Sequence, residues 1–144
     1  MYFARFSPMS DNSTANSVIR EFVQKHLGCA CPDEVFNSIV ITDGSRQFDA
    51  ESTLYQIGGR LLVAVFTPQE WQPVCAGLER LIEQGRRMRD QYGYNRFRLV
   101  IATGDRDADN LLQCAFNDCQ NTDDKIHLHV IHPRLLPSHE QAVN

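Results

Sequence analysis

The sequence predicts an α/β protein in which helices pack on a single mixed sheet, with an α+β arrangement as the alternative. Three observations support this class: five short apolar segments have the length of strands, a Gly-Gly pair joins two of them, and amphipathic helical patterns separate the later ones. At 144 residues, 42% of them hydrophobic, the chain is large and apolar enough for one packed domain. We expect that domain at 16–132, between flexible tails at 1–15 and 133–144.

An N-terminal pair of helices is expected first. Apolar residues recur at helical spacing from Val18 to Leu27, and Gly28 follows them where a glycine commonly ends a helix. Pro32 suits the first turn of a second, short helix. Cys31 is therefore the expected N-cap of that second helix.

An antiparallel hairpin or meander is expected next. A strand at 38–42 ends in an Asp-Gly turn, and segments 52–57 and 60–66 flank the Gly-Gly turn. The second arm of this hairpin is almost entirely apolar. A continuous apolar arm is typical of a central strand that is covered on both faces.

The rest of the domain predicts a βαβαβ unit that begins with the second arm of the hairpin. Residues 67–70 have the pattern of a capping box, with Pro68 at the first helical position. The long amphipathic helix that follows carries an apolar stripe from Trp71 to Met88, with Cys75 in the core. A strand, a helix and a strand complete the unit at 97–103, 107–119 and 125–131. The last three strands should run parallel through right-handed crossovers.

This order of elements is similar to that of the restriction-endonuclease-like nuclease core. Those nucleases hold Mg²⁺ and water with an acidic residue on the hairpin, followed by an acidic residue and a lysine. The matching arm at 60–66 contains no acidic residue and no lysine. The likeness therefore concerns topology alone, and no nuclease chemistry is expected.

The composition narrows the class of protein. A net charge of −4 gives no overall attraction for nucleic acid. No apolar run approaches the ~20 residues that cross a membrane, and the N-terminus lacks the apolar segment of a signal peptide. Five cysteines, an odd number, fit poorly with a secreted disulfide framework. We therefore expect a cytoplasmic protein with no membrane association, in which most thiols are free.

Cys29 and Cys31, one residue apart between a glycine and a proline, are the leading candidate site. Redox chemistry is one interpretation, because their disulfide would close a smaller ring than in C-x-x-C and strain makes a disulfide easier to reduce. Asp33 and Glu34 would offset the helix dipole, so only a modest acidification of Cys31 is expected. Metal binding is the second interpretation, and a purely structural helix junction is the third.

A metal centre would need ligands from elsewhere in the chain. The weaker metal candidates are two further cysteines and two histidines, namely Cys114, Cys119, His127 and His129. The cysteines lie near the ends of the helix expected at 107–119, and the histidines alternate with apolar residues on the last strand. Zinc or an iron–sulfur cluster would suit such a set. The alternative is a half-exposed strand whose histidines face solvent.

A basic and aromatic segment at 86–98 is the basis of an alternative function. Its candidate partner-binding residues are Arg86, Arg87, Arg89, Tyr92, Tyr94, Arg96 and Arg98. Arginine and tyrosine are favoured at protein interfaces, and arginines interleaved with aromatic rings can hold phosphates and stack on bases. A protein partner, a homodimer or a nucleic acid would fit. The structural alternative is a set of arginines that stabilise the end of a helix.

No catalytic residue is assigned, because no nucleophile elbow, phosphate-binding loop or dinucleotide motif occurs in the sequence. Enzymatic activity is left open. The leading functional hypothesis is a small α/β domain with a thiol redox or metal-binding site at Cys29 and Cys31. The alternative is a non-enzymatic module that binds a protein or nucleic acid through the segment 86–98.

Overall fold

The computed structural model describes residues 16–48 and 50–137. The tail expected at 1–15 lies outside these ranges, as do residues 138–144 of the expected C-terminal tail. The described chain contains a five-stranded sheet in which the strands follow one another in chain order. The strands are β1 (Ile39–Asp43), β2 (Ser52–Ile57), β3 (Leu61–Phe66), β4 (Arg96–Ala102) and β5 (Ile126–Ile131).

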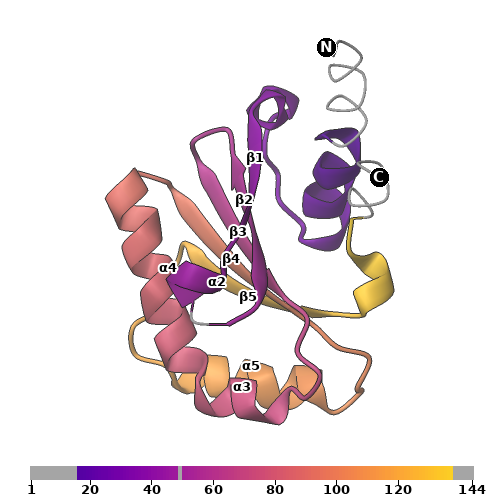
Figure 1. The fold of residues 1–144 in the computed structure, drawn as a ribbon, viewed down its shortest axis with the longest axis vertical. Helices are drawn as coiled ribbons and strands as arrows, with labels where there is room; N and C mark the ends of the chain where they lie inside the picture. The colour runs from indigo at the N-terminus through magenta and orange to yellow at the C-terminus, as the bar shows by residue number, and fades with distance from the viewer. Residues whose placement is uncertain (1–15, 49, 138–144) are drawn as a thin grey trace.

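The direction of pairing changes in the middle of the sheet. β1, β2 and β3 pair antiparallel, whereas β3, β4 and β5 pair parallel. The predicted mixed sheet, with an antiparallel meander followed by a βαβαβ unit, is therefore confirmed (Figure 1). The parallel register sets Leu61 beside Arg96 and Arg98 beside His127.

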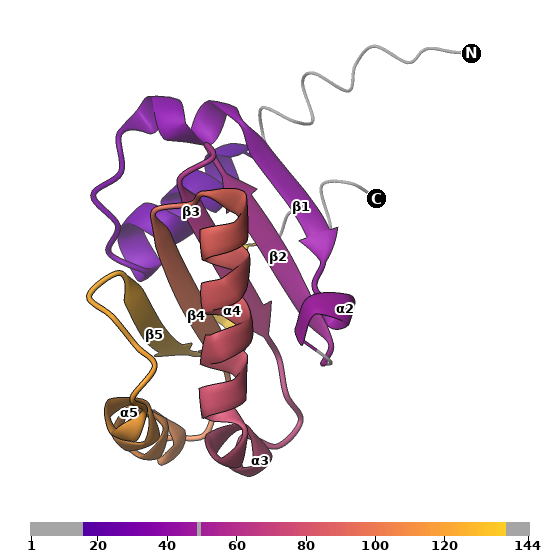
Figure 2. The ribbon, with the colours of Figure 1, turned by 90° about the vertical axis from the view of Figure 1, so that its left-hand side faces the viewer.

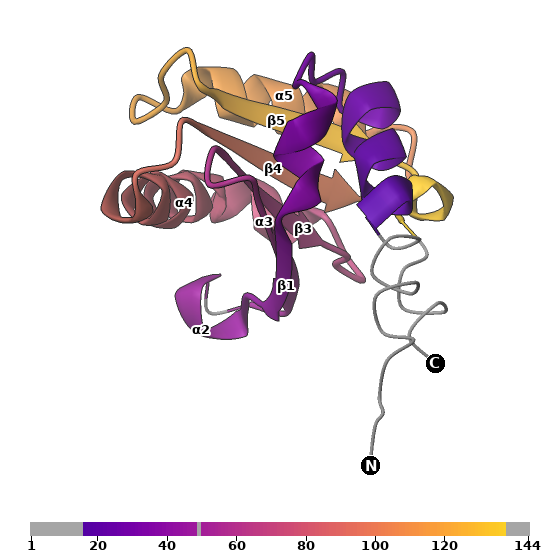
Figure 3. The same cartoon turned by 90° about the horizontal axis from the view of Figure 1, so that it is seen from above.

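Helices cover both faces of the sheet. One face is covered by α2 (Ser45–Phe48), α3 (Gln72–Ala76), α4 (Leu78–Tyr92) and α5 (Ala108–Asp118). The other face carries the N-terminal helical segment, in which helical residues 16–21 continue as η1 (Phe22–His26) and are followed by η2 (Asp33–Asn37). Figure 3 shows this indigo segment on the side of the sheet away from α4. The expected N-terminal pair of helices is thus present.

The two faces of the sheet bury two separate hydrophobic clusters. Leu62, Ala64 and Phe66 of β3 belong to the cluster beneath α3, α4 and α5. The alternate residues Leu61, Val63 and Val65 belong to the cluster beneath the N-terminal helical segment. All six residues of β3 are buried, as the continuous apolar pattern predicted, because successive side chains point to opposite faces and both faces are covered.

Close packing between α4 and β4 depends on a glycine. Gly85 lies in α4, and the ring of the fully buried Phe97 of β4 occupies the space in front of it. A Cβ atom added at Gly85 would overlap the outer atoms of that ring. The helix can therefore approach the strand closely at this point because Gly85 has no side chain. Figure 2 shows α4 crossing the middle of the sheet.

The long helix that was expected after β3 differs in two ways from the prediction. It begins at Gln72 with Trp71 as N-cap, so the predicted capping box at 67–70 is wrong. A helix starting there would place Pro73 in its interior, where proline removes a hydrogen bond and clashes with the preceding turn. The helix is also divided into α3 and α4 at Gly77 (φ −99°, ψ 9°).

Two short elements were not predicted. α2 follows the turn after β1, where the carboxylate of Asp43 accepts hydrogen bonds from the Ser45 backbone N–H (2.9 Å) and hydroxyl (2.6 Å). η3 (Pro133–Leu135) lies in the region expected to be a tail, and Leu136 packs against the cluster beneath the N-terminal helical segment. Local hydrogen bonds from side chains at α2 and an apolar contact after η3 thus hold two segments whose sequences show no periodic pattern.

Candidate functional site

Cys29 and Cys31 form a disulfide bond, with their Cα atoms 5.5 Å apart. This separation lies within the usual range for disulfides. The bond closes the short loop between η1 and η2. The leading candidate pair is therefore brought together as two directly bonded sulfurs.

The backbone of this loop is held by the helical segment before it. Gly28 has a φ of 68° and ends that segment in the left-handed conformation, as predicted. The backbone N–H of Cys29 donates to the carbonyl of Val23 (3.1 Å), and the side-chain amide of Gln24 donates to the carbonyl of Cys31 (3.2 Å). These two hydrogen bonds hold the loop on both sides of the disulfide, independently of the S–S bond.

Cys31 does not cap the second helix. η2 is a 3-10 helix that begins at Asp33, and its N-cap is Pro32 in an extended conformation (φ −63°, ψ 151°). Its first hydrogen bond joins the N–H of Val35 to the carbonyl of Pro32 (3.1 Å). The predicted cap is thus wrong by one residue, and the expected effect of the helix dipole on Cys31 loses its geometric basis.

The two sulfur-bearing residues differ in exposure. Cys29 is 7% exposed and belongs to the cluster beneath the N-terminal helical segment. Cys31 is half-buried and packs against that cluster without being one of its buried members. An incoming reagent therefore has better access to Cys31 than to Cys29.

A cavity of about 410 Å³ lies beside the disulfide. Its lining is formed by the loop 28–32 together with Val35, Arg60, Leu61, Asn95, Arg96, Arg98 and His127. The sheet residues meet there because the starts of β3, β4 and β5 are in parallel register. The described lining contains three arginines and no acidic residue, so this wall of the cavity is cationic. We call this space the arginine cavity.

Arg98 is a buried cation. It is 8% exposed, and its Nη1 donates to the carbonyl of Leu27 (2.9 Å) and to Nε2 of His129 (2.8 Å). Its Nε is buried and has no hydrogen-bond partner. Burial, and secondarily the charge of Arg96, lowers the pKa of Arg98. In the part of the chain that the structure describes, no carboxylate forms an ion pair with it.

His127 and His129 project from the face of β5 that adjoins Arg96 and Arg98 on β4. Burial, followed by the charges of Arg98 and His127, lowers the pKa of His129 to about 4. Burial likewise lowers the pKa of His127, with further contributions from Arg98 and Arg96. Both rings are therefore neutral at pH 7. They are partly buried, which corrects the alternative in which they face solvent.

The other candidate metal ligands lie on the far side of the sheet. Cys114 lies in α5, which covers the opposite face, and Cys119 is the C-cap of that helix. The thiol of Cys119 donates to the carbonyl of Ala115 (3.3 Å). Burial raises the pKa of Cys119 and also that of Cys75, which packs beside the same cluster. Within residues 16–48 and 50–137, no group of three His, Cys, Asp or Glu side chains is arranged to hold a metal. Zinc and iron–sulfur binding stay predictions.

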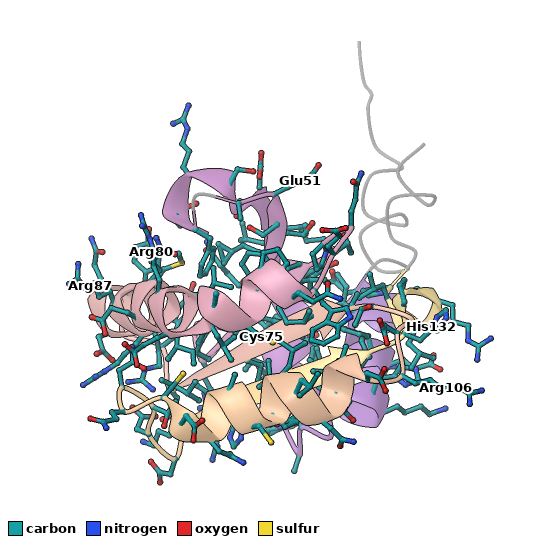
Figure 4. All side chains as sticks on the ribbon, turned by 90° about the horizontal axis from the view of Figure 1, so that it is seen from below. Glu51, Cys75, Arg80, Arg87, Arg106 and His132 are labelled. Carbon is teal, nitrogen blue, oxygen red and sulfur yellow. A yellow bond between two sulfur atoms is a disulfide. The ribbon has the colours of Figure 1, made fainter. Side chains whose placement is uncertain are left out.

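The basic and aromatic segment 86–98 is divided between the two faces of the sheet. Arg86 and Arg87 are exposed on α4, and Figure 4 shows Arg87 extending outward from that helix. Arg89 is buried and forms two hydrogen bonds with the carboxylate of Asp123 (3.0 and 2.9 Å).

The remaining members of this segment follow the same division. Tyr92 is exposed, its ring centroid lies 6.1 Å from that of Tyr94, and the Tyr94 hydroxyl donates to Gln56 (3.3 Å). Arg96 and Arg98 project to the opposite face, toward the disulfide. These residues do not form one continuous surface, so binding of a protein, a second copy or a nucleic acid stays a prediction.

Sequence reasoning missed two residues of the arginine cavity, Arg60 and Asn95. The backbone N–H groups of Asn95 and Arg96 both donate to the carbonyl of Arg60 (2.8 and 3.1 Å). Aligning the starts of the two predicted parallel strands would have placed these residues side by side. The alternation of arginine with apolar residues at 96–99 was the second signal, because it sets Arg96 and Arg98 on one face.

No family model, curated protein or solved structure matches the chain. In the part that the structure describes, none of the helices has the length and apolar character needed to span a bilayer. A larger cleft of about 700 Å³ lies on the opposite face, between α2 and the α3–α4 pair, and contains no cysteine among its described lining residues. Of these two hollows, the arginine cavity is the one that has cysteines among its described lining residues.

Proposed function

We propose that the protein exchanges thiols and disulfides through Cys29 and Cys31. The observation that carries this proposal is a disulfide whose outer sulfur belongs to a half-buried residue on the wall of the arginine cavity. Structural disulfides of small domains are usually buried staples between distant segments, whereas this one closes a loop of three residues and adds little restraint to the unfolded chain. Its position and its short loop favour chemistry over stabilisation.

The exchange takes place in two substitutions at sulfur. The thiolate of a small thiol, RS⁻, attacks Sγ of Cys31, so that an RS–Sγ bond forms and the bond to Cys29 breaks. Cys29 leaves as a thiolate. A second thiolate then attacks the sulfur of the R group, which forms the small disulfide and releases Cys31. The protein gains two electrons, the two thiols lose two, and their protons pass to the cysteines or to water.

Unequal burial assigns the two cysteines different roles. Cys31 is the more accessible sulfur and receives the attack, whereas Cys29, 7% exposed, is the leaving thiolate. In the reverse direction, Cys29 attacks the mixed disulfide at Cys31 and expels the small thiol. Arg96 and Arg98 line the same space, and positive charge near sulfur favours the thiolate form. We place this exchange in the cytoplasm, where small thiols are abundant and kept reduced.

Exchange under native conditions is the first test. The oxidised full-length protein is incubated with 2-mercaptoethanol, quenched by alkylation, and its modified cysteines are located by mass spectrometry. We expect Cys29 and Cys31 to become alkylated together while the protein remains folded. A disulfide that is reduced only after unfolding in denaturant would show a structural staple and contradict the proposal. Stoichiometric metal in the reduced, purified protein would favour the metal-binding alternative instead.

Single variants test the assigned roles. The reduced Cys29→Ser variant, which keeps Cys31, should form a mixed disulfide with bis(2-hydroxyethyl) disulfide about tenfold faster than the Cys31→Ser variant, because Cys29 is poorly accessible. The matched control is Cys114→Ser, which removes an exposed cysteine on α5 and should leave exchange at Cys29 and Cys31 unchanged. Equal rates at the two cysteines would overturn the assignment.

A further inference from the structure

We propose that the arginine cavity binds the carboxylate of an anionic small thiol and thereby selects the exchange partner of Cys31. This inference rests on the proposed function and adds to it the chemical class of the substrate. The cavity and the disulfide share a wall, because Cys29 and Cys31 line the space that also contains Arg60, Arg96 and Arg98. A thiol held there by its negative end would have its sulfur near the bond that it must attack.

The charge of the cavity supports an anion. Three arginines contribute to its wall, and no acidic residue is present among the described lining residues. Arginine is the residue best suited to bind carboxylates, because its planar fork can donate two parallel hydrogen bonds. His127 adds a neutral imidazole and Asn95 an amide, both of which can donate a hydrogen bond.

The burial of Arg98 is an independent observation that points to an anion. Arg98 is more than nine-tenths buried and lines the cavity, and its buried Nε has no hydrogen-bond partner. Buried donors are almost always paired, because an unpaired one loses its hydration without compensation. The charge of Arg98 is likewise uncompensated, because no carboxylate in the described chain forms an ion pair with it. A carboxylate bound in the cavity would supply the missing counter-charge.

The size of the cavity fits a small molecule. Its volume of about 410 Å³ lies within the range of small-ligand sites. The loop 28–32 that forms one wall is held by hydrogen bonds to Gln24 and Val23, which fix its shape from within the protein. We therefore expect discrimination by charge among thiols that differ little in size.

Three thiols of similar size and different charge test the proposal, namely 3-mercaptopropionate, 2-mercaptoethanol and cysteamine. Second-order rate constants for reduction of the Cys29–Cys31 disulfide are measured per thiolate, and each is divided by the rate of the same thiolate with a free small disulfide. We expect the anionic thiol to be favoured over the cationic one by about tenfold at low salt, and the preference to fall as salt rises.

Substitutions then locate the preference. Arg60→Gln and Arg96→Gln should each reduce it severalfold, whereas Arg96→Lys should retain most of it because the charge remains. Arg106→Gln is the matched control, because it removes the same charge from the loop that follows the opposite end of β4 (Figure 4). Unfolding midpoints near that of the wild-type protein show that each variant is folded.

The possible outcomes separate this inference from the proposed function. Exchange at equal normalised rates with all three thiols would overturn the inference and leave the proposed function standing. A preference for the anionic thiol that survives both Arg60→Gln and Arg96→Gln would overturn the assignment to the arginine cavity. Absence of native-state exchange with any thiol would overturn the proposed function, and the inference with it.

Discussion

Gly85→Ala is expected to destabilise the wild-type protein by about 2 kcal/mol and to stabilise a Phe97→Leu variant by up to about 1 kcal/mol. In the wild-type chain the new methyl group would overlap the outer atoms of the Phe97 ring, which is fully buried, so the ring or the helix must shift. Leucine lacks those outer ring atoms. With the overlap removed, Gly85→Ala should stabilise the Phe97→Leu variant, because alanine has a better helix propensity than glycine.

Urea unfolding of the wild-type protein, the Gly85→Ala and Phe97→Leu variants and the double variant measures the coupling between the two positions. Phe97→Leu alone should cost about 1–2 kcal/mol, since the ring lies in the cluster beneath α4. Gly77→Ala is the control for glycine replacement next to the same helix, because a Cβ there meets only the carbonyl of Pro73 at 3.7 Å. That control should change stability by less than about 1 kcal/mol. An equal cost of Gly85→Ala in both backgrounds would show that the Phe97 ring is not the obstacle.

Acid is expected to destabilise the protein through His129. The pKa of its imidazole is lowered in the folded state from 6.5 to about 4, first by burial and then by Arg98 and His127. Between these values the unfolded chain binds a proton that the folded chain does not. The folded state therefore has its full stability with respect to this group above pH 6.5 and loses it as the pH falls toward 4. We expect the free energy of unfolding to fall by about 2.5 kcal/mol between pH 7 and pH 4.5 because of His129.

The His129→Gln variant tests this dependence. Its amide oxygen can still accept the hydrogen bond from Arg98, but it does not titrate. We expect the free energy of unfolding of the wild-type protein to fall by about 2.5 kcal/mol more than that of the variant between pH 7 and pH 4.5. His127 titrates in both chains, so its contribution cancels in the comparison. Identical pH dependence of the two chains would contradict the prediction.

Most of the sheet could be predicted because its strands are short, apolar and separated by clear turns. The continuous apolar run of β3 indicated a strand buried on both faces, and the positive φ angles of Gly58 and Gly59 agree with the predicted hairpin turn. The first turn of the helix after β3 was misplaced because Thr67 and Pro68 match a capping pattern. The competing signal was Pro73, whose ring requires that the helix begin close to it.

The site was predictable only in part. Two cysteines one residue apart are visible in any reading of the sequence, and their disulfide needs no long-range contact. The burial of Arg98 was not predictable, because it depends on a carbonyl 71 residues earlier in the chain. Arginines at 86–98 appeared as one basic surface because proximity in sequence does not show that α4 and β4 direct their side chains to opposite faces.

The order of strands in the sheet has a consequence for the way in which the chain folds. Every strand pairs only with strands that adjoin it in sequence, so the sheet can grow from strand to strand without bringing the two ends of the chain together. Docking of the N-terminal helical segment is different, because the bond from Arg98 to Leu27 spans 71 residues. Contacts of such separation carry the larger loop-closure entropy and tend to slow folding. The segment that bears the disulfide is therefore expected to reach its place on the sheet late, after the strands that form the opposite wall of the arginine cavity have paired.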